Sequence, residues 1–120
     1  MEKVNLLQKF TLFNDLWSPK IVGELNGQYV KLAKLKGEFV WHQHEAEEEL
    51  FMVIEGTLVI QLRGQDDVVL EQGEFVIIPR GVEHKPVAAE EVHVLLFESK
   101  STLHTGNVKT ERTVEKQDWI

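Results

Sequence analysis

The chain of 120 residues is long enough for one folded domain, and its 42% hydrophobic and 28% charged residues are ordinary for a globular protein. Its formal net charge of −7 would repel phosphate backbones and anionic lipid headgroups, so we expect no binding to nucleic acid or to a membrane surface. The absence of cysteine excludes disulfides and thiolate metal sites, which leaves histidine and carboxylate as the strong metal ligands. No apolar run is long enough for a signal peptide or a membrane span, so the sequence predicts a cytoplasmic protein with a small-molecule or protein partner.

Apolar residues recur at intervals of three and four between Asn5 and Trp17. This spacing predicts a short amphipathic helix of about two turns with an extended continuation, and Pro19 ends it because the residue before a proline avoids helical geometry. We expect residues 1–19 to cover part of an apolar surface formed by the rest of the chain.

Residues 26 and 27 are Asn-Gly between two alternating apolar segments, which is the strongest short-range sequence signal for a β-hairpin. Short apolar segments with glycine at most of the turns follow, and the expected strands cover residues 37–44, 49–54, 57–63, 67–71, 74–79, a segment around His84, and 91–98. Strands at this spacing predict an all-β antiparallel sandwich or barrel with its core at about residues 20–100. We expect one domain over residues 1–120, in which the tail from 103 to 120 is a peripheral clasp or is partly disordered.

Two of the expected strands, residues 50–54 and 75–79, are apolar on both faces. One face of such a strand can line a barrel, but the other needs cover from the N-terminal segment or from a second subunit. We therefore predict a homodimer.

Four polar residues near these strands are candidates for a site. His42 and His44 are separated by one residue, so strand alternation would place both side chains on one face, roughly 7 Å apart. Glu49 begins the next strand and is preferred over Glu48 because it shares a face with that strand's alternate apolar residues. If the two strands pair antiparallel, Glu49 returns beside the histidines, where a buried carboxylate is costly unless a metal neutralises it. His84, which follows a Pro-Arg-Gly turn, is the fourth candidate.

The spacing of these residues resembles the two conserved motifs of the cupin superfamily. The first motif resembles His42-x-His44, four residues, Glu49, six residues and Gly56, and the second resembles Gly73, five residues, Pro79-x-Gly81, two residues and His84. The sequence departs from the family pattern in the spacing between Gly37 and His42 and at Ala88, neither of which is a ligand position. The resemblance implies a double-stranded β-helix, or jelly-roll barrel, that holds one divalent metal through His42, His44, Glu49 and His84.

Short single-domain cupins of this kind are loosely similar to mannose-6-phosphate isomerases. Three imidazoles and one carboxylate leave two adjacent coordination positions open, which suits Fe(II), Mn(II), Ni(II) or Zn(II). The resemblance implies a small polar or carbohydrate-like ligand and an activity such as an isomerase or a dioxygenase. The alternatives are a non-catalytic module that binds or senses a small ligand, and a storage or structural barrel.

The remaining residues around the expected cavity are weaker candidates. His93 alternates with Leu95 and Phe97 and could face the cavity, but we expect its ring to be satisfied by hydrogen bonds within the sheet. We assign no role to His104 in the tail. The expected apolar lining of the pocket consists of Phe51, Val53, Phe75, Ile77 and Phe97.

Overall fold

Seven strands and one short helix make up the described part of the chain, which in the computed structural model is residues 1–102, 106 and 116–120. The helix α1 spans Leu6–Phe10. The strands are β1 (Lys20–Leu25), β2 (Gln28–Glu38), β3 (Glu49–Glu55), β4 (Leu58–Leu62), β5 (Val68–Leu70), β6 (Phe75–Ile78) and β7 (His84–Ser99). Every strand pairing is antiparallel, as the sequence predicted.

The hairpin between β1 and β2 forms where the Asn-Gly pair predicted it. Asn26 and Gly27 have φ angles of 51° and 77°, and Leu25 pairs with Gln28 across the turn. Two consecutive positive φ angles match the right-handed twist of the flanking strands, and asparagine and glycine tolerate them best. The prediction for this turn is confirmed.

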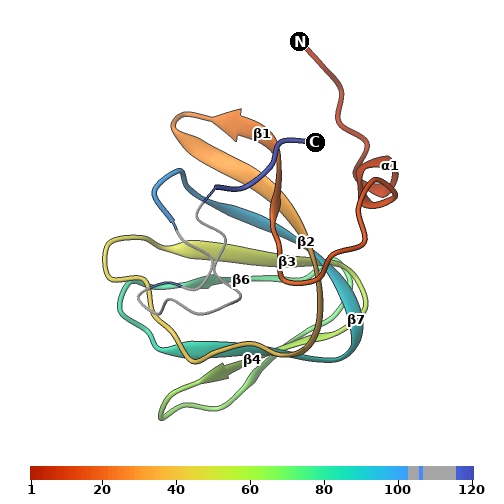
Figure 1. Cartoon of the computed structure of the whole chain (residues 1–120). Helices are drawn as coiled ribbons and strands as arrows, with labels where there is room; N and C mark the ends of the chain where they lie inside the picture. Colours follow the sequence, from red (N-terminus) through yellow and green to blue (C-terminus); the bar gives the residue numbers. More distant parts are fainter. Residues whose placement is uncertain (103–105, 107–115) are drawn as a thin grey trace.

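The strands form two layers that share β7 (Figure 1). The larger layer has the order β1-β2-β7-β3-β6, whereas β4 pairs with β5 and with the first residues of β7. Strand β7 has 16 residues and replaces the two separate strands that we expected, because no glycine or proline interrupts residues 87–91. Strand β7 bends from one layer into the other, as strands do in a barrel made of two packed layers. This arrangement fits the jelly-roll barrel that the sequence predicted.

Side-chain alternation separates the barrel interior from its outer surface. On β3, the side chains at Glu49, Phe51 and Val53 are buried and their neighbours are only partly buried. Inward-facing residues of the other strands, including Leu58 and Ile60, complete the main core cluster. The outer face of β6 differs from our expectation, since Phe75 and Ile77 are 57% and 50% exposed and do not line the interior.

The N-terminal segment packs on the outside of the larger layer, where Figure 1 shows α1 beside the strands. Phe10 and Phe13 form a second apolar cluster with Val22 and Leu32. The helix ends at Phe10, well before Pro19, so our prediction of its end was wrong. The next residues leave helical geometry because Phe13 and Trp17 are buried against different parts of the sheet, and tertiary packing overrides a short helical pattern.

The end of the chain lies against β1. Ile21 donates its amide hydrogen to Asp118 at 2.8 Å, and Ile120 donates to the carbonyl of Ile21 at 3.0 Å. The last residues therefore form a clasp, while the prediction for residues 103–105 and 107–115, which include His104, lies outside the described residues. No helix in the described part of the chain is long and apolar enough to cross a membrane.

Candidate metal centre

The backbone brings the two predicted motifs together through one pair of residues. His42 and His84 form an isolated bridge in which each amide donates to the other's carbonyl, at 3.0 and 2.8 Å. Residues 39–44 do not form the strand that we predicted, since β2 ends at Glu38 after a register shift between Leu35 and Gly37. The bridge nevertheless turns both histidines inward.

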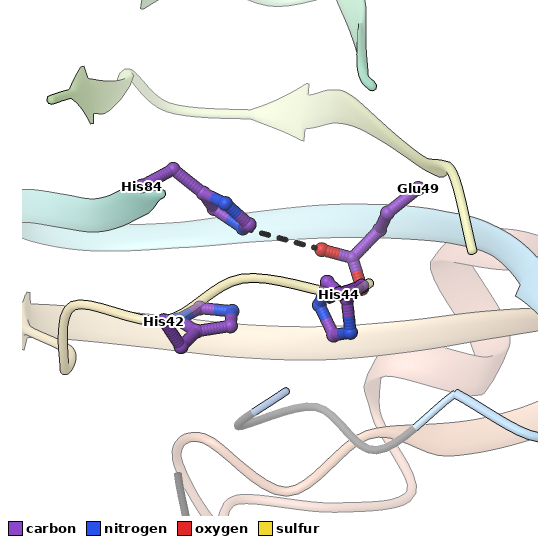
Figure 2. Close-up of side chains that lie close together, drawn as sticks. All are labelled: His42, His44, Glu49 and His84. Carbon is purple, nitrogen blue, oxygen red and sulfur yellow. Dashed lines mark ion pairs between the residues drawn. The ribbon is translucent and has the colours of Figure 1, made fainter. Parts of the chain in front are cut away.

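Glu49 reaches the histidines by a different route from the one predicted. Strand β3 pairs with β6 and β7 and not with the segment that carries His42, so Glu49 enters from the larger layer. Figure 2 shows the four side chains of His42, His44, Glu49 and His84 pointing toward one another from β3, the start of β7 and the connection between β2 and β3.

The four side chains are close enough to share one ion. One potential ligand atom from each lies within 4.8 Å of the other three, and all four residues are buried. Glu49 Oε2 is 3.4 Å from His44 Nε2, and Glu49 Oε1 is 3.7 Å from His84 Nε2. This cluster of histidine and carboxylate could hold a metal ion.

Hydrogen bonds orient two of the imidazole rings. The Nδ1 atoms of His42 and His84 lie 2.9 Å from the carbonyls of Val40 and Val82, so each Nδ1 carries the hydrogen and donates it. The opposite Nε2 atom of each ring then presents a lone pair to the centre of the cluster. This tautomer is the one that metal ligation requires.

Unpartnered polar atoms show that these residues fit a cation. Within the cluster, four buried atoms have no hydrogen-bond partner, namely Nε2 of His42, His44 and His84 and Oε1 of Glu49. Buried nitrogen and oxygen atoms without partners cost about 1–3 kcal/mol each, so such groups are rarely left unsatisfied. Three lone pairs and one carboxylate oxygen directed at a common point would all be satisfied by one divalent ion.

The protonation of His42 agrees with that role. Burial and, to a smaller extent, the proximity of His84 lower the pKa of His42 from 6.5 to about 4. The ring is therefore neutral at pH 7, with the hydrogen on Nδ1.

A second carboxyl group and a lysine lie behind Glu49. Burial alone would raise the pKa of Glu49, but the proximity of Glu98, His44 and His84 lowers it well below its ordinary value. Burial and repulsion by Glu49 raise the pKa of Glu98 well above its ordinary value, although Lys31 Nζ lies 2.7 Å from Glu98 Oε1.

Our sequence reasoning did not find Lys31 or Glu98. Their signal was available, because each occupies the inward-facing position of a buried strand: Lys31 alternates with Ala33 on β2, and Glu98 alternates with Leu96 on β7. A charged residue at such a position is rarely buried unless it is paired.

The interior beside the cluster is mostly apolar. A cavity of about 20 Å³, room for one or two water molecules, has nine apolar residues and two polar ones in its wall. The wall consists of Trp17, Pro19, Ala33, Leu35, Phe39, His42, Glu49, Phe51, Pro86, Val94 and Leu96. Trp17 stacks on Phe39 with ring centroids 4.6 Å apart, and Phe39 meets the ring of His42 edge-on at 5.5 Å.

Other predicted residues lie away from this centre. The Glu48 side chain is 54% exposed and pairs with Arg80 at 3.6 Å. His93 stacks on Phe10 outside the barrel, and its Nε2 lies 2.9 Å from Glu91 Oε2 on the same strand, which confirms the expected hydrogen bond within the sheet. Phe97 alternates with the inward-facing residues of β7 and points outward as well. Of the expected apolar lining, Phe51 borders the cavity.

The fold and the cluster define a small jelly-roll barrel with buried histidines and a carboxylate in its interior. A family model described as a cupin domain matches residues 28–99, and the chain therefore belongs to the cupin domain family. The chain is also 38% identical to Uncharacterized protein YdbB of Bacillus subtilis (strain 168) over 64 residues, which cover 53% of this chain and 57% of that protein. The match thus spans little more than half the length of that relative.

Two solved structures share the fold over most of the chain. A cupin-2 domain containing protein from Shewanella frigidimarina NCIMB 400 is 47% identical, with a TM-score of 0.79 and coverage of 81% of this chain and 94% of that one. Protein NMB1881 from Neisseria meningitidis is 25% identical, with a TM-score of 0.75 and coverage of 82% and 100%.

Proposed function

We propose that this cupin binds one divalent metal ion through His42, His44, Glu49 and His84 and uses it to bind a small molecule in the barrel. The observation that carries the proposal is the set of four buried, unpartnered polar atoms that converge on one point. Iron, manganese, nickel and zinc all accept imidazole and carboxylate ligands, and the donor set does not choose among them.

The chain's own residues prepare the site for such an ion. Val40 and Val82 fix the tautomers of two histidines, and burial keeps His42 neutral without a competing proton. The apolar wall excludes bulk water, which strengthens electrostatic interactions inside the barrel. A bound ion of this class would supply Lewis-acid or oxygen chemistry, which is the basis for an isomerase or a dioxygenase activity.

The wall of the cavity supports a ligand with a polar end and an apolar body. Only His42 and Glu49 interrupt its apolar lining, so a carbohydrate would leave most of its hydroxyl groups without partners. A ligand larger than one or two waters can enter only if the wall moves, and Trp17 lies in a segment outside the strands.

The metal proposal is tested by elemental analysis of protein purified without added metal. We expect about one ion per chain in the wild type and severe loss in His42→Ala and His84→Ala, because each removes one of four ligands. The matched control is His93→Ala, which removes a histidine outside the barrel and should retain the metal. Full occupancy in His84→Ala would refute the ligand assignment.

The same preparation separates a catalytic from a non-catalytic role. An aerobic activity screen with the metal found would detect oxygen consumption or isomerisation of small polar substrates. A loaded protein that binds such compounds without converting them would favour the alternative of a binding or sensory module.

We propose in addition that two copies of the chain associate through the outer face of β3 and β6. Phe75 and Ile77 pair with Met52 and Leu50, so these four side chains form one apolar patch at the edge of the larger layer. The N-terminal segment packs against Val22 and Leu32 instead, which leaves Phe75 and Ile77 exposed. Exposed apolar patches of this kind favour association.

A further inference from the structure

Trp17 stands between the cavity in the barrel and the solvent outside. The residue lies in the connection from α1 to β1 (Figure 1), which runs beside β2 where the Trp17 amide donates to the Lys34 carbonyl at 2.9 Å. Trp17 lines the same cavity as His42 and Glu49, yet it is 8% exposed, so part of the residue meets solvent. The indole is therefore part of the partition between the candidate metal centre and the outside.

The cavity has no room for a ligand while this partition is in place. Its volume of about 20 Å³ holds only one or two water molecules, and most of its wall belongs to β2, β3 and β7. Backbone hydrogen bonds tie Phe39 and His42 to β7, so these two wall residues are fixed as well. The ring of Pro19 is joined to its own backbone and cannot swing away from it. The Trp17 side chain, in contrast, can move aside without breaking any backbone hydrogen bond of the strands.

The backbone of Trp17 gives the indole a reason to move. Its φ angle is 58°, a left-handed conformation that is an outlier for a bulky residue. Such strain persists only where other contacts hold it, and it is concentrated at ligand clamps and switches. The ring of Trp17 stacks on Phe39 with 8° between the planes, and Nε1 donates to the Lys36 carbonyl at 3.0 Å. A return to negative φ would change the direction in which the indole leaves the backbone, and only these contacts oppose it.

We propose that Trp17 is a gate residue, whose indole closes the barrel in this structure and swings aside to admit a ligand to the metal centre. This inference rests on the proposed metal site. It gives Trp17 control over the size of the molecules that enter and over their rate of entry, although the residue does not ligate the ion.

The test uses the full chain loaded with Co(II), whose visible absorption changes when an added molecule occupies an open coordination position. Imidazole and azide are each mixed with the protein in a stopped-flow instrument, and the rate constant for binding is measured. Imidazole is a planar ring that the cavity cannot hold, whereas azide is a narrow linear ion. A gate that is open for about 0.1–10% of the time slows the binding of imidazole by about 10- to 1,000-fold.

Two variants and a matched control define the role of the indole. Trp17→Ala removes it, so imidazole should bind at least about 10-fold faster than to the wild type, and the rate for azide should change less. Trp17→Phe keeps a ring on Phe39 but cannot donate to the Lys36 carbonyl, so it preserves the packing and its rate for imidazole should lie between the other two. Trp119→Phe is the control, because Trp119 is 55% exposed and lies outside the cavity wall, and both rates should stay unchanged.

Each alternative result overturns a defined part of the proposal. Equal imidazole rates in the wild type and in Trp17→Ala would show that Trp17 does not control entry. Equal acceleration of azide and imidazole, or an increase in Trp119→Phe as large as that in Trp17→Phe, would show a general loosening of the protein instead of a gate. Co(II) uptake without any response of Trp17→Ala to imidazole would refute entry past Trp17 and leave the metal site intact. A wild type that takes up no Co(II) would refute the metal site itself and this inference with it.

Discussion

The stability of the metal-free protein should fall on mild acidification because of His42. The folded protein holds the pKa of this histidine at about 4, whereas the unfolded chain should titrate near the ordinary value of 6.5. Between these two values the unfolded state binds more protons than the folded state, so the free energy of unfolding decreases as the pH falls. The full effect is about 3 kcal/mol, of which about 2 kcal/mol should be lost between pH 7 and pH 5.

Urea unfolding in the presence of a chelator, followed by tryptophan fluorescence at pH 7, 6 and 5, measures this loss. His42→Gln removes the titrating ring, so the decrease between pH 7 and pH 5 should be smaller by about 2 kcal/mol than in the wild type. His93→Gln is the control, since this ring stacks on Phe10 outside the barrel and its loss should not change the contribution of His42. An equal decrease in the wild type and in His42→Gln would show that burial does not hold this ring neutral.

Three other predictions test the fold, the cavity and the assembly. Gly56→Ala should lower the unfolding free energy by at least about 2 kcal/mol in urea denaturation, because φ is +100° and a Cβ would lie 3.2 Å from the backbone of β7. Gly64→Ala is the control, and it should cost less in the same assay because the space around Gly64 is open. Trp17→Ala should destabilise the protein by about 3–5 kcal/mol and allow added indole to raise the unfolding temperature, whereas Trp41→Ala should not respond to indole. Phe75→Lys should convert dimers to monomers in light scattering, and an unchanged assembly would place the interface elsewhere.

Sequence reasoning located the cluster because the spacing of a motif is a local property. The interval between His42, His44 and Glu49 could be read without knowing which strands pair, and the wrong pairing did not change the residues selected. The predicted strand over residues 37–44 failed at Gly37, whose φ is +86° beside a register shift in β2. Such a bulge depends on the partner strand, so single-sequence alternation could not reveal it.

The two faces of β6 could not be assigned from the sequence for the same reason, because they too depend on the partner strand. The run from Phe75 to Ile78 is apolar at every position, so its pattern fixed neither which side chains face the interior nor how far the strand is covered. The missing information is the pairing of Phe75 with Met52, which sets the face that each residue presents. Lys31 and Glu98 were missed for a different reason, since their partnership joins residues 67 positions apart.

The bend of β7 explains why all these groups meet at one end of the barrel. His84 is the first residue of β7 and Glu98 is near its last, yet His84 Nε2 lies 3.7 Å from Glu49 Oε1 and Glu98 is directly opposite Glu49 in the strand register. A straight strand would separate them by about 45 Å at the usual rise per residue, so the two halves of β7 must fold over opposite layers.

Two glycines accommodate that bend. Gly37 pairs with Ala88 next to the register shift in β2, and Gly56 packs against the backbone of Glu91 and Val92, where a Cβ would lie 3.2 Å from the nearest atoms. Gly56 has no Cβ to press on β7 where that strand crosses from one layer to the other. At Gly37 the requirement is the backbone, because a φ of +86° beside the register shift in β2 favours glycine. The glycine of the first cupin-like motif thus acts on the site through the path of β7, which carries both His84 and Glu98 to Glu49.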